Sequence, residues 1–134
     1  MFNETTKVLV VDDMKTMRKI IRSGLKKLGM SEVVEAEDGS QAWMMLRESK
    51  GKQGFDLIIS DWNMPQMTGI ELLKHVRADA DLKEMPFLMI TAEAEQAAVV
   101  EAVKEKVSNY VVKPFSPEVL AEKLKQVYKK HFGE

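Results

Sequence analysis

Five polar residues follow directly after short apolar runs of this 134-residue chain, and together their types suit phosphoryl transfer. Three are carboxylates, Asp12, Asp13 and Asp61, and the other two are the hydroxyl of Thr91 and the ammonium of Lys113. Two unit charges about 5 Å apart repel by roughly 3 kcal/mol at an effective dielectric of 20. Three clustered carboxylates therefore raise their own pKa values or hold a cation. Oxygen ligands alone favour Mg²⁺, with Mn²⁺ as a substitute, and a carboxylate beside such an ion can attack phosphorus to form an acyl phosphate.

Five apolar, β-branched runs predict the strands that would position these residues. Each run is short and is followed by a polar or charged residue, which is typical of strands buried inside a parallel sheet. The runs cover residues 7–11, 33–36, 57–60, 87–90 and 110–112. Ligands of such sheets bind at the carboxyl ends of the strands. The three carboxylates, the hydroxyl and the ammonium are therefore expected to meet at one edge.

Apolar residues at helical spacing predict a helix after every strand. The first helix carries Met17, Ile20, Ile21, Leu25 and Leu28 and ends at Gly29. The second is expected to be capped by Ser40, the third to begin at Thr68 or Gly69, and the last to open at Pro117 behind Ser116. Five strand-then-helix units predict an α/β fold, a five-stranded parallel sheet with helices on both faces.

The composition predicts one domain over residues 1–134 and excludes several classes of protein. Apolar residues make up 45% and charged residues 31%, with a formal net charge of −1, so nothing favours nucleic acid or an anionic membrane as a partner. No cysteine is present, which excludes disulfides and thiolate metal sites and favours a cytoplasmic location. No signal peptide or membrane-spanning run is visible. The two histidines, His75 and His131, fall in helical patterns far from the acidic residues and are expected at the surface.

Four motifs resemble those of the receiver domains of two-component response regulators: VLVVDD, IISDWNMPQMTG, LMITAEA and YVVKPF. The resemblance covers almost the whole chain, and it is greatest to the single-domain chemotaxis regulators. It implies a flavodoxin-like (βα)5 fold with strand order 2-1-3-4-5.

The resemblance also implies a role for each polar residue around the acceptor. Asp61 is the phosphoacceptor. Asp13, Asp61 and the main-chain carbonyl of Asn63 coordinate Mg²⁺, while Asp12 holds metal-bound water. Asn63 and Glu93 occupy the positions that set the rate of autodephosphorylation.

The remaining implied roles concern the response to phosphorylation. Lys113 pairs with the acceptor carboxylate and then with the phosphoryl group, and its bond to Pro114 is expected to be cis. Thr91 shifts towards a phosphoryl oxygen, and Tyr110 rotates inward behind it.

The function that follows is that of a stand-alone response regulator, phosphorylated on Asp61 by a histidine kinase. It would signal as a monomer by binding a target protein, the flagellar motor switch, with a phosphatase as a further partner. It is not expected to be an enzyme beyond self-catalysed phosphotransfer and autodephosphorylation. A phosphorelay intermediate, which passes the group to a second histidine protein, shares every site residue and stays open as the alternative.

Two other classes fit the acidic residues less well. A phosphatase of the haloacid-dehalogenase type needs a D-x-D pair after its first strand, whereas here Asp12 and Asp13 are adjacent and Met14 follows. A flavodoxin-like electron carrier binds a phosphate in its first loop, where two carboxylates would repel it.

Overall fold

Five strands form one parallel sheet in the computed structural model, which describes residues 1–50, 54–92 and 96–133. Their order across the sheet is β2-β1-β3-β4-β5, which confirms the order that the resemblance implied. The strands are β1 (Lys7–Val11), β2 (Glu32–Ala36), β3 (Leu57–Asp61), β4 (Phe87–Ala92) and β5 (Asn109–Lys113).

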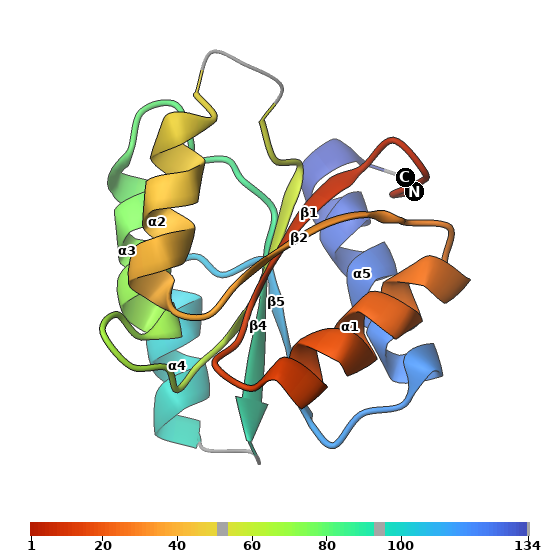
Figure 1. The fold of residues 1–134 in the computed structure, drawn as a ribbon. Coiled ribbons are helices and arrows are strands. Elements are labelled where there is room, and N and C mark those ends of the chain that lie inside the picture. Colours follow the sequence, from red (N-terminus) through yellow and green to blue (C-terminus); the bar gives the residue numbers. More distant parts are fainter. Residues whose placement is uncertain (51–53, 93–95, 134) are drawn as a thin grey trace.

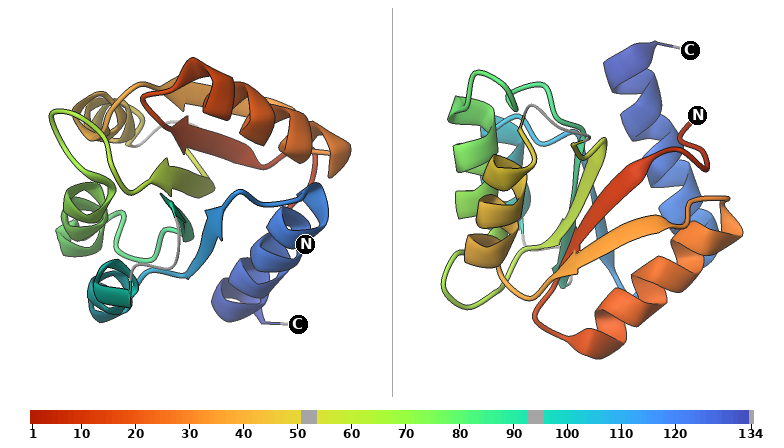
Figure 2. Two further views of the ribbon diagram at one scale, coloured as in Figure 1. Left: turned by 90° about the horizontal axis from the view of Figure 1, so that it is seen from below. Right: turned by 45° about the horizontal axis from the view of Figure 1, so that its top comes forward.

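Helices cover both faces of the sheet, as the alternating pattern predicts (Figure 1). Two of them pack on one face, α1 (Lys15–Lys27) and α5 (Pro117–Phe132). The other face carries α2 (Gly39–Glu48), α3 (Gly69–Ala78) and α4 (Gln96–Lys104), and the two sets separate clearly when the sheet is seen from its end (Figure 2). Within the described residues, no helix is both long enough and apolar enough to cross a membrane.

The central strands β1, β3 and β4 are buried on both faces, so each face of the sheet has its own core. Successive strand residues point to opposite sides. Leu9 and Val11 of β1 therefore join the core under α2 and α3, whereas Val8 and Val10 join the core under α1 and α5. All four side chains are fully buried, which accounts for a continuous apolar run instead of an alternating one.

Side-chain caps fix where several helices begin. Thr68 caps α3 and forms a reciprocal capping box with Glu71, and Ser116 caps α5 ahead of Pro117, both at the predicted positions. The cap of α2 is Asp38, whose carboxylate accepts from the amide of Gln41. The prediction of Ser40 as this cap was wrong because Asp, an equally strong capping residue, precedes it by two positions.

The inward face of α1 differs from the one its apolar spacing predicts. Ile20 is 49% exposed, whereas Arg18 is only 8% exposed and its guanidinium lies under the loop after β1. A pattern of apolar residues cannot identify this burial, because it depends on acceptors that the loop and β2 supply.

Two helices end in the same way, with a residue in the left-handed region. Gly29 follows α1 with φ 88°, and Lys106 follows α4 with φ 64°. At both ends the amide of the following residue donates a hydrogen bond to a helix carbonyl: Met30 donates to Leu25, and Val107 donates to Ala102. Gly29 adopts this conformation freely, whereas Lys106 adopts it at a steric cost.

Arg77 organises the opposite edge of the sheet, where β4 and β5 begin. Its guanidinium donates to the main-chain carbonyls of Lys106 (2.9 Å), Met85 (2.7 Å) and Lys83 (3.1 Å). A further bond reaches the Ser108 hydroxyl at 3.4 Å. One side chain thus ties α3 to the loops that precede both strands.

His131 completes this network and is half-buried, so the prediction that it lies at the surface was wrong. Ser108 Oγ accepts from the Phe87 amide (2.9 Å) and from Arg77, so its own proton goes to Nε2 of His131 at 2.6 Å. This geometry requires a neutral imidazole with its proton on Nδ1. Burial and the nearby charges of Arg77 and Lys130 lower the pKa of His131 accordingly.

Candidate functional site

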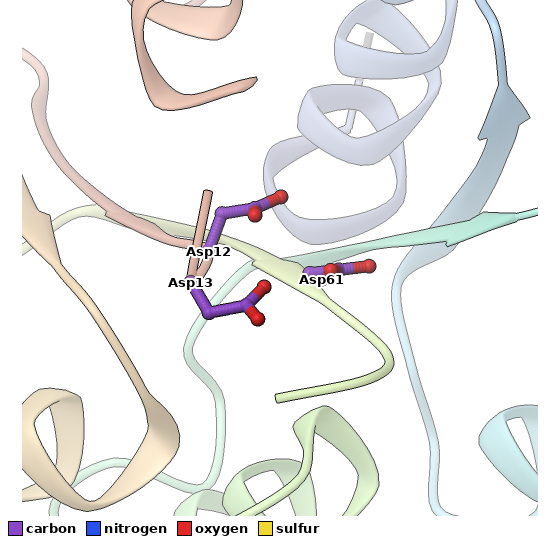
Figure 3. Close-up of side chains that lie close together, drawn as sticks. All are labelled: Asp12, Asp13 and Asp61. Atoms are coloured by element: carbon purple, nitrogen blue, oxygen red, sulfur yellow. The ribbon is translucent and has the colours of Figure 1, made fainter. Parts of the chain in front are cut away.

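Three carboxylates meet at the carboxyl edge of the sheet. Asp61 is the last residue of β3, and Asp12 and Asp13 follow β1, its hydrogen-bonded neighbour. Figure 3 shows the three side chains extending from these two strand ends towards the same side. One oxygen from each can be chosen so that all lie within 4.8 Å of one another. The strand ends predicted from the sequence are therefore neighbours in the sheet, and this brings the three carboxylates together.

Asp12 is fully buried, and only part of its carboxylate is satisfied. Oδ1 accepts from the amide of Met14 at 2.8 Å, whereas Oδ2 is buried and has no hydrogen-bond partner among the described residues. Its nearest cation is the Lys113 ammonium at 3.6 Å from Oδ2. Burial raises the pKa of Asp12, the Met14 amide opposes this, and the negative charge of Asp61 adds to it.

Asp61 is also buried, and its carboxylate lies closer to the Lys113 ammonium than that of Asp12 does. Its Oδ1 accepts from the amide of Trp62 at 2.8 Å and lies 3.3 Å from the Lys113 ammonium. Burial raises the pKa of Asp61, and Lys113 is the main influence that lowers it. Lys113 itself is 17% exposed, so its charge acts with little screening by solvent.

The carboxylates fit a hard divalent cation. At 4.8 Å and an effective dielectric of 20, each pair of charges repels by roughly 3 kcal/mol, and Lys113 supplies one positive charge against three negative ones. The donors are all oxygens, one of them the unpartnered Oδ2 of Asp12, and Asp13 is exposed to solvent. Such a set suits an ion that keeps several of its waters. The group can therefore hold a metal ion where the two strand ends meet.

Thr91 lies on β4, the strand next to the acceptor's strand β3, and Tyr110 lies on β5, the strand beyond it. Asp61 pairs with Ile90 in the β3–β4 register, so Thr91 lies one residue beyond it, and Thr91 is buried. Tyr110 lies half-buried on β5 opposite Met89. The Lys113–Pro114 peptide bond is cis, as the resemblance implied. The proposed movements of Thr91 and Tyr110 stay predictions.

The loop after the acceptor, residues 62–68, is held at both ends by close backbone contacts. The amide of Gly69 donates to the carbonyl of Trp62 at 2.9 Å, and that of Gly39 donates to Met67 at 3.2 Å. A Cβ atom on Gly69 would overlap the main-chain oxygen of Asp61. The loop therefore carries Asn63, which is exposed two residues beyond Asp61, on a fixed path. Glu93 lies outside the described residues, and its predicted role stays a prediction.

Arg18 is a site residue that the sequence reasoning missed. Its Nη1 donates to the main-chain carbonyl of Asp12 at 2.6 Å, and its Nε donates to Glu35 on β2 at 2.8 Å. The only signal available from the sequence was its spacing, six residues after Asp12 and one turn before Arg22.

The sequence and the fold are similar to those of known proteins. The sequence profile of the response regulator receiver domain matches residues 8–125. The chain is 48% identical to the chemotaxis protein CheY of Pseudomonas aeruginosa over 95% of its own length and 99% of the relative's. It is 50% identical to CheY1 of Helicobacter pylori, over 90% and 95% of the two chains. A structure of CheY4 from Vibrio cholerae, crystallized at low pH, superposes with a TM-score of 0.80 at 38% identity, over 91% and 98% of the two chains.

The five-stranded parallel sheet of this order has the flavodoxin-like fold, and its acidic cluster lies at the carboxyl ends of the strands, where ligands of such sheets bind. The chain belongs to the response regulator receiver domain family and is closely related to the CheY chemotaxis response regulators.

Proposed function

We propose that this chain is a response regulator that a histidine kinase phosphorylates on Asp61 in a Mg²⁺-dependent reaction. The observation that carries the proposal is the meeting of three carboxylates and the Lys113 ammonium at one sheet edge. Its output is binding of the phosphorylated form to a target protein. Because the similar proteins are chemotaxis proteins, the target we propose is the flagellar motor switch.

The chemistry begins with a carboxylate oxygen of Asp61 as nucleophile. It attacks the phosphorus of a phosphohistidine, an O–P bond forms, and the N–P bond breaks with its electron pair returning to the imidazole nitrogen. Asp61 must be ionised to attack, and Lys113 favours this by opposing the effect of burial on its pKa. Asp13, Asp61 and the Asn63 carbonyl would hold Mg²⁺, and Asp12 would hold its water. When bound, the ion supplies positive charge to the phosphoryl oxygens.

The response to phosphorylation passes through β4 and β5. The Thr91 hydroxyl, buried at the end of β4, can donate to a phosphoryl oxygen while Lys113 pairs with another. Tyr110 then moves inward behind Thr91, and the surface of α4, β5 and α5 changes shape. Water attack on the acyl phosphate ends the signal, and Asn63 and Glu93 set its rate.

The same surface carries the features of a docking site. Val100 and Val103 of α4 are 58% and 60% exposed, and the Lys123 ammonium of α5 lies over the Tyr110 ring at 5.1 Å. Exposed apolar residues beside a basic rim suit an amphipathic acidic segment. This is the surface that we propose for the target.

Phosphorylation with acetyl phosphate or a kinase tests the acceptor. Asp61→Asn should carry no stable label, because an amide is a poor nucleophile. Asp56→Asn is the matched control, since Asp56 lies exposed near the other end of β3, where it accepts from the Lys7 amide. Undiminished labelling of Asp61→Asn would overturn the assignment.

The output is tested separately with beryllofluoride, which mimics the phosphoryl group. Affinity for a peptide from the motor switch should rise when beryllofluoride and Mg²⁺ are both present, and Thr91→Ala should abolish the rise. Transfer of the label to a second histidine protein, with no gain in affinity for the peptide, would identify a phosphorelay intermediate instead.

A further inference from the structure

Arg18 makes two contacts that no other described side chain of α1 combines. Its side chain is 10% exposed, and the guanidinium donates Nη1–H to the carbonyl of Asp12 (2.6 Å) and Nε–H to Oε1 of Glu35 (2.8 Å). The hydrogen bond from Arg18 is the leading influence that lowers the pKa of Glu35, so that carboxylate stays ionised and keeps the guanidinium in place. Arg18 thus connects β2 to the acidic loop that follows β1.

The contacts of Asp12 show what this connection fixes. Its amide donates to Ala36 of β2, its carbonyl accepts from Arg18, and Oδ1 accepts from Met14. Only Oδ2 is left without a hydrogen bond among the described residues. Since every other polar atom of Asp12 is bonded, the position of Oδ2 and the direction in which the chain continues to Asp13 are both set.

We infer that Arg18 is a positioning residue for the metal site: it holds the Asp12–Asp13 loop so that both carboxylates face the cation. The inference rests on the proposed Mg²⁺ site, and it adds a residue that touches neither the metal nor the phosphoryl group.

Arginine suits this position for a geometric reason. The planar guanidinium presents Nε–H and Nη1–H in a fixed fork, so it reaches the Asp12 carbonyl and Glu35 at once. A lysine carries the same charge on a single ammonium and cannot reproduce that spacing. The substitution Arg18→Lys therefore removes the geometry while keeping the charge.

The chain offers a matched control one turn along the same helix. Arg22 also binds Glu35, through Nε at 2.9 Å and Nη2 at 2.8 Å, but it contacts the Val33 carbonyl and not Asp12. Arg22→Lys makes the same chemical change beside the same carboxylate at equal net charge. A difference between the two variants therefore reports the contact with Asp12.

Mg²⁺ titration of the two variants tests the inference. Binding is followed by the fluorescence of Trp62 in a Trp43→Phe background, and calorimetry provides an independent dissociation constant. Arg18→Lys should weaken Mg²⁺ binding about tenfold, the range found for partners of metal ligands. Arg22→Lys should change it less than about twofold, as expected of an exposed ion pair.

A second pair covers the case in which Arg18→Lys does not fold. Glu35→Met removes the carboxylate that orients Arg18, and Glu32→Met removes the same charge from an exposed position on the same strand. Glu35→Met should weaken Mg²⁺ binding by roughly threefold more than Glu32→Met.

Equal constants within each pair would overturn the role of Arg18 and leave the metal site standing. A parent protein without saturable Mg²⁺ binding would overturn the metal site and the inference together.

Discussion

Buried polar groups are hydrogen-bonded to one another at one edge of the sheet, whereas at the other edge they are crowded carboxylates. At the edge where β4 and β5 begin, the Ser108 hydroxyl is hydrogen-bonded to both Arg77 and His131, and Arg77 also donates to three main-chain carbonyls. At the carboxyl edge, three carboxylates share one ammonium, and Asp12 Oδ2 has no hydrogen bond among the described residues.

The difference separates polar groups that stabilise the fold from polar groups that serve the proposed chemistry. Satisfied buried groups stabilise, and removing one leaves its partners unpaired. Crowded carboxylates destabilise the metal-free protein, and the cost is recovered only when a cation binds. Removing a buried polar group should therefore lower the stability of the metal-free protein at the hydrogen-bonded edge and raise it at the acidic edge.

The largest effect is expected at the satisfied edge. Arg77→Met should destabilise the protein by about 2 kcal/mol, because the carbonyls of Lys83, Met85 and Lys106 lose their hydrogen-bond donor. Urea unfolding measures this, with Arg47→Met on the exposed side of α2 as the control expected to change little. If the two variants lose the same stability, the network contributes nothing specific.

The opposite sign is expected at the acidic edge. Asp12→Asn should stabilise the metal-free protein by about 1 kcal/mol, because the amide can still accept from Met14 while its charge no longer repels Asp61. Urea unfolding in a chelator measures the gain. Added Mg²⁺ should stabilise the parent more than the variant and so reduce or reverse the difference. A variant less stable than the parent without metal would show that the carboxylates are not under strain.

Effects of about the same size or smaller are expected at the two left-handed helix ends. Lys106→Gly should stabilise the protein by ~0.5 kcal/mol, because glycine adopts φ 64° without a clash. The reciprocal change, Gly29→Ala at φ 88°, should destabilise it by about 1 kcal/mol. Thermal unfolding of both variants decides this, and a loss of stability in Lys106→Gly would mean that the lysine side chain contributes more by its contacts than its backbone costs.

The acidic edge should also show in the pH dependence of stability. Burial raises the pKa values of Asp12 and Asp61 in the folded protein above the unfolded value of 3.8. As pH falls from neutral, the folded state therefore takes up these protons first, and both groups add stability until the unfolded chain is protonated as well. The gain from Asp12→Asn should be greatest near pH 7 and shrink in acid. A gain that is constant with pH would contradict the raised pKa of Asp12.

The satisfied edge should give the smallest and opposite pH effect. The pKa of His131 is lowered from 6.5 by burial and by Arg77 and Lys130, with Glu84 acting the other way. The unfolded chain is protonated first, so this histidine costs stability as pH falls below 6.5. His131→Gln should remove that part of the acid loss, which is visible as a difference from the parent between neutral pH and about pH 5.

The strand ends could be predicted from the sequence because each apolar run is followed by polar or charged residues. That change located Asp12, Asp61 and Lys113, and the rule for parallel sheets placed them together. Arg18 of α1 could not be found in this way, because its burial depends on Glu35, 17 residues away on β2. His131 was mistaken for a surface residue for the same reason: its partner Ser108 lies 23 residues earlier, directly before β5.

The tight contact between Gly69 and the main chain of Asp61 has a consequence for how this sequence can vary. Position 69 carries no charge and no reactive group, yet any side chain there would overlap the carbonyl oxygen of the acceptor residue. In a library of all single substitutions selected for signalling, this position should tolerate replacement as poorly as Asp61 itself. A pattern of intolerance alone would then assign Gly69 to the chemistry, although what it contributes is the absence of a side chain.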